Sequence, residues 1–292
     1  MGTRPSTTQP APVVSNPRPP APRLPRPPSP RERRRSPGGG QGRIVEKPEM
    51  AGAADSARSS SHRRLAEVQR RVARVHRRAD PEEQLRFYEG WAPEYEEDVA
   101  VLQYQAPQLA AACLASIFQG PLQEALVLDV ACGTGLVAQE LQVKGFRHLH
   151  GLDGSQAMLE HARCKGLYQD LKRCLLGQEA LPAAEGCYDA VLIVGALSEG
   201  QVPTSVVPEL LRVTKAGGYV CLTTRSNLSN LEYKAKLHQV LDQLEEQGLW
   251  RKVTEQDVEK WERATSEQES AQGLDYISGV VYLYQKNPVP VL

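Results

Sequence analysis

The sequence predicts an α/β fold in which helices cover both faces of a doubly wound, mostly parallel sheet. Short apolar segments of strand length alternate with helical segments between residues 126 and 247. A glycine turn, ACGTG at 131–135, joins the first of these strands to the helix that follows it. Two acidic residues, Asp129 and Asp153, lie near the ends of the first two strands. Because sheets of this kind bind ligands at the carboxyl ends of their strands, we expect the functional site there.

The composition argues against several classes of protein. Lysine plus arginine and aspartate plus glutamate each number 35 in the 292 residues, so the whole chain is neutral. No apolar run reaches the roughly 18 residues of a membrane helix, and the N-terminus lacks the apolar core of a secretory signal. The six cysteines form no C-x-x-C pair, so we expect neither a metal site nor a disulfide framework. Reduced thiols are typical of the cytoplasm, which we expect, or of the nucleus.

Residues 1–60 are predicted to form a disordered tail. They are rich in proline, arginine, serine and glycine and contain no aromatic residue, so they can bury too little apolar surface to offset the entropy of ordering. The basic run at 31–35 is expected to be part of this solvated tail, with nucleic-acid binding or nuclear import as the alternative. Met50 is a candidate second start, with the residues before it as an extension.

Residues 61–105 are expected to form N-terminal helices and a lid ahead of a main domain at 106–288. The first helix is predicted at 62–78, where arginines surround four apolar residues at helical spacing. These residues are Leu65, Val68, Val72 and Val75. Packing against the core is the expected role of this helix, and contact with a membrane or a nucleic acid is the alternative.

The segment 85–95 concentrates aromatic residues in a chain that has few of them. Its members Tyr88, Trp91 and Tyr95 could anchor the N-terminal helices to the core. They could equally form a lid over a flat, apolar ligand. The two roles are compatible, and we expect both.

The central motif of the chain is the strand, turn and helix that begin at Leu126. The glycines of the turn allow a positive φ and let the backbone approach a ligand closely, while the start of the next helix offers free N–H groups. The turn also fits the G-x-G-x-x-A fingerprint of dinucleotide-binding proteins, which is weak alone. Asp129 adds weight to a ligand site, because a carboxylate in an apolar strand is costly to bury unless it binds something.

The next strand, predicted at 148–153, ends in a second acidic residue. Asp153 follows Gly135 by 18 residues, close to the spacing at which an acidic side chain binds ribose hydroxyls. Ser155 is predicted to cap the following helix. The pair His148 and His150 lacks a nearby third ligand, so we do not expect it to bind a metal.

The remaining elements follow from the same periodicities. Helices are predicted at 104–118, at 208–214 with a glycine C-cap at 216–218, and at 229–247 with an end at Gly248. Strands are predicted at 173–176, 188–194, 219–224, 250–258 and 276–284. Two strands after the last helix are not typical of a dinucleotide-binding domain.

The ordered motifs resemble those of the class I S-adenosylmethionine-dependent methyltransferases. The glycine turn is similar to the first motif of that family, and GLDGS at 151–155 is similar to its second. YDAV at 188–191 and ELLRVTKAGG at 209–218 resemble the motifs around its fourth and fifth strands. The series WAPEY, LIVGALSEGQVP and SNLSNLEYK further resembles a methyltransferase-like branch known from the Williams–Beuren syndrome chromosomal region. The resemblance implies a Rossmann-like sheet of seven strands.

The resemblance also implies that S-adenosylmethionine is the cofactor and assigns residues to it. Asp129 and the turn would hold the methionine end, Asp153 would accept both ribose hydroxyls, and the aromatic segment would close over the cofactor. Leu197 and the 177–179 region would frame the adenine. The residues implied to bind the cofactor are Asp129, Ala131, Gly133, Gly135, Asp153, Gly154, Ser155, Glu179, Leu197, Tyr88, Trp91 and Tyr95. Ala131 departs from the family's usual glycine, and Gly177 from its usual aspartate.

The activity that we expect is methyl transfer to an unidentified small molecule or protein. Because the sulfonium is already activated, catalysis consists mainly of alignment, and the resemblance identifies no catalytic side chain. No N-P-P-Y-like motif follows the fourth strand, where GALS stands at 195–198, so a nucleic-acid acceptor is not expected. The alternatives are a non-catalytic S-adenosylmethionine-binding or adaptor protein and, less favoured, an NAD-dependent oxidoreductase.

Overall fold

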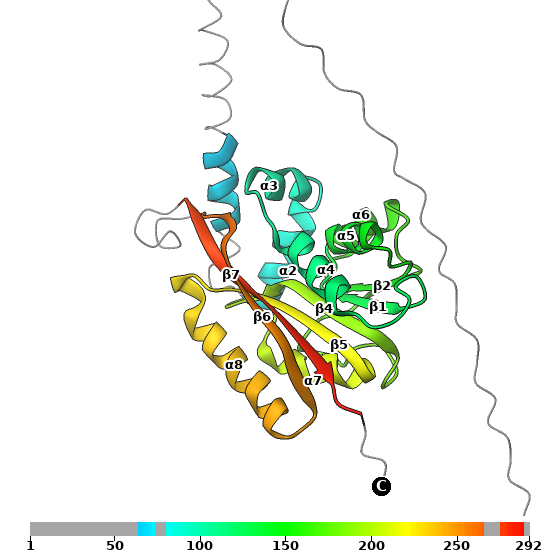
Figure 1. Cartoon of the computed structure of the whole chain (residues 1–292). Helices are drawn as coiled ribbons and strands as arrows, with labels where there is room; N and C mark the ends of the chain where they lie inside the picture. The colour runs from blue at the N-terminus through cyan, green and yellow to red at the C-terminus, as the bar shows by residue number, and fades with distance from the viewer. Residues whose placement is uncertain (1–63, 74–79, 266–274, 289–292) are drawn as a thin grey trace, which may run out of the picture. The chain divides into compact units, whose positions relative to one another are not determined.

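The computed structural model describes residues 64–73, 80–265 and 275–288 (Figure 1). All of them belong to one compact unit, which spans residues 49–292. The predicted tail at 1–60, including the basic run and the candidate start at Met50, lies outside the described residues. Within the described ranges, no helix combines the length and the apolarity that crossing a membrane would need.

The centre of the fold is a seven-stranded sheet with the strand order β3-β2-β1-β4-β5-β7-β6. The first five strands pair in parallel, and β7 runs antiparallel to both of its neighbours. The strands are β1 (Leu126–Val130), β2 (His148–Asp153), β3 (Asp170–Arg173), β4 (Tyr188–Leu197), β5 (Thr214–Arg225), β6 (Trp250–Arg263) and β7 (Tyr276–Lys286). The doubly wound, mostly parallel sheet of seven strands is therefore confirmed.

Helices cover both faces of this sheet (Figure 1). The main helices are α2 (Pro81–Trp91), α3 (Tyr95–Val101), α4 (Ala106–Ile117), α5 (Leu136–Lys144), α6 (Gln156–Cys164), α7 (Val207–Val213) and α8 (Leu231–Glu246). Successive residues of β1 face opposite clusters, as the period of a strand requires. Leu128 and Val130 pack in the core that holds α7 and α8, whereas Val127 packs in the core that holds α4 and α5.

The N-terminal helical residues 64–73 pack on α2 and α3. Val68 and Val72 are buried with Trp91, Val99 and Leu102, so the predicted packing role is confirmed for these two valines. Val75, which was expected on the same face, lies outside the described residues. The predicted aromatic anchor is thus part of a small apolar cluster of its own.

The third strand lies three residues earlier than predicted. The segment 170–173 pairs with β2, and its last partner is Asp153. The apolar residues that suggested a strand at 173–176 leave the sheet edge, and Cys174, Leu175 and Leu176 line a cavity instead. Their hydrophobicity therefore reflects burial beneath this cavity and not strand pairing.

The prediction of a glycine C-cap at 216–218 is wrong. Helix α7 ends at Val213, and β5 begins at the next residue. Gly217 and Gly218 lie in a bulge where the register between β4 and β5 shifts. A Cβ on Gly218 would lie 2.8 Å from the carbonyl oxygen of Asp189. Glycine is needed there because two strands approach closely, and not because a helix ends.

Strand β6 is longer than predicted, and its extension is anchored to the N-terminal helices. The amide of Arg263 donates to the Leu102 carbonyl at 2.8 Å, and the amide of Gln105 donates to the Trp261 carbonyl at 3.0 Å. The indole of Trp261 lies over Gly279 of β7, where a Cβ would come within 2.2 Å of the ring. Gly279 therefore lets the indole pack flat on the sheet.

We predict that Gly279→Ala destabilises the protein, whereas Gly90→Ala does not. The added methyl at 279 collides with the Trp261 ring, and overpacking of this kind costs about 1–3 kcal/mol. At Gly90, in the exposed part of α2, an added Cβ meets nothing within 4 Å, so alanine should stabilise by about 0.5–1 kcal/mol. Urea unfolding measures both changes. Equal midpoints for Gly279→Ala and the parent would contradict the tight packing of Trp261.

Candidate functional site

The turn after β1 is built from residues with unusual backbone conformations. Ala131, Gly133 and Gly135 have φ values of 58°, 53° and 91°. The positive φ of Ala131 is uncommon for a residue with a side chain and costs about 1–2 kcal/mol. Gly135 precedes α5 and lies against Tyr168, whose ring would be 3.1 Å from an added Cβ. The turn is thus held in a shape that most sequences avoid.

The carboxylate of Asp153 holds this turn in place. One of its oxygens accepts a hydrogen bond from the amide of Gly133, and the other accepts one from the amide of Ser155, both at 2.8 Å. The Ser155 hydroxyl in turn accepts from the amide of Met158 at 3.2 Å, as a helix cap does. Burial raises the pKa of Asp153, and the two backbone amides oppose that rise. Each oxygen keeps lone pairs for a further donor.

Asp129 is buried beneath the turn. The Tyr168 hydroxyl donates to Oδ2 of Asp129 at 2.7 Å, whereas Oδ1 bonds no described residue. Burial raises the pKa of Asp129 to about 7, against the opposing effect of the Tyr168 hydrogen bond. A half-satisfied buried carboxylate is costly without a further donor, so Asp129 is suited to a cationic ligand.

A cavity of about 190 Å³, here called the loop cavity, opens at the carboxyl ends of β1, β2 and β4. It brings together seven of the residues that the sequence assigned to the cofactor. These are Tyr88, Tyr95, Ala131, Gly133, Asp153, Gly154 and Ser155. Its apolar wall includes Leu85, Met158, Leu175 and Leu176. A flat ring and a polar tail could therefore bind in it together.

The structure places the other five assigned residues outside the lining of the loop cavity. Asp129 is buried beneath the turn, and Gly135 ends the turn against Tyr168. The Glu179 side chain is exposed and accepts from the amide of Leu175 at 2.6 Å. Leu197 is buried in the core, and Trp91 donates to Asp98 in the N-terminal cluster at 2.8 Å.

Of the 177–179 region that was expected to frame the adenine, Gln178 lines the loop cavity. Gly177 has a φ of 80°, and a Cβ there would come within 2.4 Å of Pro203. An aspartate therefore could not replace Gly177 without a change in the adjacent turn.

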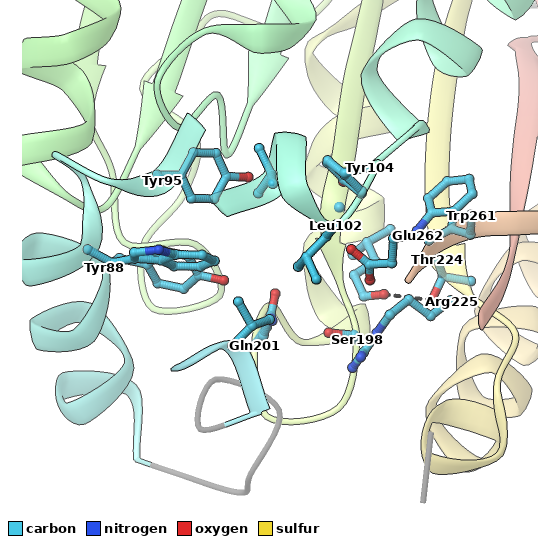
Figure 2. Close-up of a pocket in the computed structure, with 15 residues that line it drawn as sticks. Tyr88, Tyr95, Leu102, Tyr104, Ser198, Gln201, Thr224, Arg225, Trp261 and Glu262 are labelled. Atoms are coloured by element: carbon cyan, nitrogen blue, oxygen red, sulfur yellow. Dashed lines mark hydrogen bonds between the residues drawn. The ribbon is translucent and has the colours of Figure 1, made fainter. Parts of the chain in front are cut away.

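A second cavity of about 60 Å³, here called the aromatic cavity, adjoins the first (Figure 2). The two share four lining residues, which are Tyr88, Tyr95, Gly195 and Gln201. The aromatic cavity is also lined by Trp91, Leu197, Ser198, Arg225, Trp261 and Glu262. Leu197 and Trp91 thus contribute to this second cavity.

Sequence reasoning missed several polar or aromatic residues of the aromatic cavity, among them Ser198, Arg225, Trp261 and Glu262. Ser198 stands in the GALS segment, which was read only for the absence of another motif. Arg225 ends β5, and no pattern distinguishes it from other basic residues. Trp261 and Glu262 lie beyond the predicted end of the sixth strand, so nothing in the sequence placed them near the site.

The two histidines of β2 lie apart from both cavities. His150 bonds the Tyr188 hydroxyl at 3.1 Å, and His148 bonds the Gln169 amide at 2.7 Å. Across the ranges that the structure describes, no three histidine, cysteine, aspartate or glutamate side chains are grouped so that they could hold a metal ion.

Comparisons with known proteins identify similar sequences among methyltransferases. Residues 127–218 match the family described as "Methyltransferase domain". The chain is 59% identical over 186 residues to methyltransferase-like protein 27 of Homo sapiens, across 64% of this chain and 76% of that protein. It is 32% identical over 108 residues to the ubiquinone biosynthesis O-methyltransferase of Alkalilimnicola ehrlichii, across 36% of this chain and 43% of that protein.

A solved structure, the TehB-like methyltransferase of Corynebacterium glutamicum, aligns with a TM-score of 0.46 at 13% identity, over 68% of this chain and 98% of that one. The relationship itself rests on the human protein, of which the chain covers more than two thirds. The chain belongs to the class I S-adenosylmethionine-dependent methyltransferases, in the family of methyltransferase-like protein 27.

Proposed function

We propose that this methyltransferase binds S-adenosylmethionine in the loop cavity and methylates a small molecule or a protein. The observation that supports this site is the Asp153 carboxylate, which lines the loop cavity together with Gly133. Its oxygens retain lone pairs for the ribose hydroxyls, and the open side of Gly133 leaves room for a ligand next to the backbone.

The remaining roles follow from charge and shape. Asp129 would attract the methionine ammonium through its unpaired oxygen. Gln178 and the apolar wall would hold the adenine, and Tyr88 and Tyr95 would cover the cofactor. When bound, the cofactor supplies a methyl group on an activated sulfonium. The chain's residues have to orient the donor and the acceptor and exclude water.

We further propose that residues 61–105 form N-terminal helices and a lid, here together called the roof, and that residues 106–288 form the methyltransferase domain. All six cysteines are free, which fits a reducing compartment and supports a place in the cytoplasm, with the nucleus as the alternative. Among their described lining residues, each cavity has at most one basic side chain, which supports a small molecule or a protein as the acceptor over a nucleic acid, whose sites carry an extended basic groove.

Two assays test the function. Calorimetry with S-adenosylmethionine and with NAD should show binding of the first only. Cell extracts incubated with the protein and a methyl-labelled donor should contain a labelled product. Binding without any labelled product would favour a non-catalytic adaptor.

We predict that Asp153→Ala weakens S-adenosylmethionine binding about 100-fold. Two charged hydrogen bonds to the ribose, each worth about 1.5–3 kcal/mol, are lost, and about 3 kcal/mol corresponds to that factor. The turn is also released, because the amides of Gly133 and Ser155 lose their acceptor.

The control for this variant is Asp170→Ala, at an exposed carboxylate that pairs with Lys172 on the surface. It should bind within about twofold of the parent, which corresponds to roughly 0.4 kcal/mol. An Asp153→Ala variant that bound equally well would rule out the ribose role.

We predict that the affinity for S-adenosylhomocysteine, which carries the same ammonium, rises about tenfold from pH 6 to pH 8. With a pKa of about 7, Asp129 is mostly protonated at pH 6 and mostly ionised at pH 8, and only the ionised form attracts the ammonium. Titration calorimetry should show proton release on binding near pH 6.

Two variants separate Asp129 from other titrating groups. Asp129→Asn should abolish the pH dependence over this range. Tyr168→Phe removes the hydrogen bond that lowers the pKa of Asp129, so its midpoint should move to higher pH. A pH profile that Asp129→Asn leaves unchanged would assign the titration to another group.

A further inference from the structure

We propose that the aromatic cavity is the acceptor site and that it takes a small, flat ring compound without net charge, bearing a hydroxyl, amine or thiol. This inference rests on the proposed function, because it needs the cofactor in the adjoining loop cavity. It narrows the acceptor from any small molecule or protein to one chemical class. Four properties of the cavity support this assignment: its position, its size, its walls and its buried polar groups.

The position is that of an acceptor. Tyr88, Tyr95, Gly195 and Gln201 belong to the walls of both cavities. A ligand in the aromatic cavity would therefore be next to the cofactor. The three shared side chains and the Gly195 backbone lie where the two cavities meet. Figure 2 shows the hydroxyls of Tyr88 and Tyr95 and the amide of Gln201 directed toward the same space.

The size limits the ligand to about one ring. A single water molecule needs about 10–15 Å³ measured in this way, so about 60 Å³ holds roughly four to six groups of that size. The walls come from the helical residues 64–73, from α2 and α3, and from the ends of β4, β5 and β6. In the described part of the chain, walls from this many elements form a compact pocket that suits a small ligand better than an extended polypeptide or nucleic-acid strand.

The walls favour a flat ligand. Two sets of aromatic side chains flank the cavity: Tyr88, Trp91 and Tyr95 from the roof, and Tyr104 with Trp261 on the side of the sheet. Neighbouring rings in these sets lie 4.8 to 6.2 Å apart between centroids, with tilted or edge-to-face geometry. A ring compound between them can make the same kinds of contact.

One buried hydroxyl in the wall lacks a partner. Ser198 is 3% exposed, and its Oγ bonds no described residue. Its backbone is satisfied separately, because its amide donates to Ala196 and its carbonyl accepts from Gln201. A hydroxyl that is buried without a hydrogen bond is costly, and a polar group on the ligand would remove that cost.

The charges in the wall favour a neutral ligand. Arg225 and Glu262 are 7% and 8% exposed, and they lie across the cavity from Tyr88 and Tyr95 (Figure 2). Attraction by one of these charges is offset by repulsion from the other, so a ligand with a net charge would pay its desolvation cost with little compensation. A neutral hydroxyl, amine or thiol can donate to the carboxylate and accept from the guanidinium.

A carboxylate in the same wall can accept the proton that methylation releases. When the acceptor heteroatom forms its new bond to the methyl carbon, the electrons of the broken S–C bond stay on sulfur, and the heteroatom loses one proton. Among the described residues that line this cavity, Glu262 is the one carboxylate. It is therefore the group that we assign to receive this proton.

Tryptophan fluorescence tests the proposal directly. Two of the three tryptophans, Trp91 and Trp261, line the aromatic cavity, so its occupancy should alter their emission. The protein is first saturated with S-adenosylhomocysteine, as calorimetry verifies, and then titrated with phenol, benzoate, benzylammonium, a lysine-rich peptide and oligo-dT. Phenol should give a saturable change, and each charged probe should bind at least about tenfold more weakly.

Variants test whether the change in fluorescence comes from a ligand in the aromatic cavity. Ser198→Ala should weaken phenol binding about three- to tenfold, the factor for one neutral hydrogen bond, with S-adenosylhomocysteine binding unchanged. Ser116→Ala is the matched control, because that hydroxyl bonds within its own helix, to Cys113, and should leave both affinities unchanged. Once a turned-over acceptor is in hand, Glu262→Gln should lower kcat more than it raises KM.

The outcomes separate this proposal from the proposed function. Absence of S-adenosylhomocysteine binding would overturn the cofactor site itself. Normal S-adenosylhomocysteine binding with no saturable phenol signal, or with the same phenol affinity in Ser198→Ala, would overturn the aromatic cavity as the acceptor site. Tight binding of the peptide or of oligo-dT would overturn the substrate class.

Discussion

The functional edge of this sheet depends on one carboxylate with two amide donors. Asp153 ends β2 and bonds the amides of Gly133 and Ser155, which belong to the turn after β1 and to the cap of α6. It therefore joins two strand ends and two helix starts at one point. The turn, with left-handed residues at Ala131 and Gly133, is held by this acceptor together with two backbone hydrogen bonds of Cys132, one to Leu152 and one to Gly135, both 2.9 Å long. The shape of the loop cavity follows from this contact.

A second buried carboxylate organises the roof. Asp98 accepts from the indole of Trp91 and from the guanidinium of Arg71, both at 2.8 Å, so the helical residues 64–73 are linked to α2 and α3. The roof in turn bonds to the end of β6 through Leu102. Since Trp91 is held in this cluster, the aromatic segment anchors the N-terminal helices, while its Tyr88 and Tyr95 line the loop cavity.

The antiparallel edge of the sheet contributes to the wall of the aromatic cavity. β7 lies between β5 and β6 and presents Gly279 opposite Arg225 and Val258. The missing side chain at Gly279 admits the Trp261 ring over the sheet. The end of β6 therefore contributes Trp261 and Glu262 to the wall of the aromatic cavity, and a shorter β6 would remove both from it.

The sequence by itself determined the fold class, the elements from β1 to α6 and the two carboxylates, because each depends on local periodicity, glycine turns or a cap. Only the tertiary structure decided where β3 pairs, why Gly218 is required and which residues share a cavity. Those features depend on contacts between segments far apart in the chain, such as the hydrogen bond from the Gln84 side chain to the Gly200 carbonyl. Ser198 and Glu262 have no local pattern that marks them, so only the packing of the roof against β4 and β6 brought them to the site.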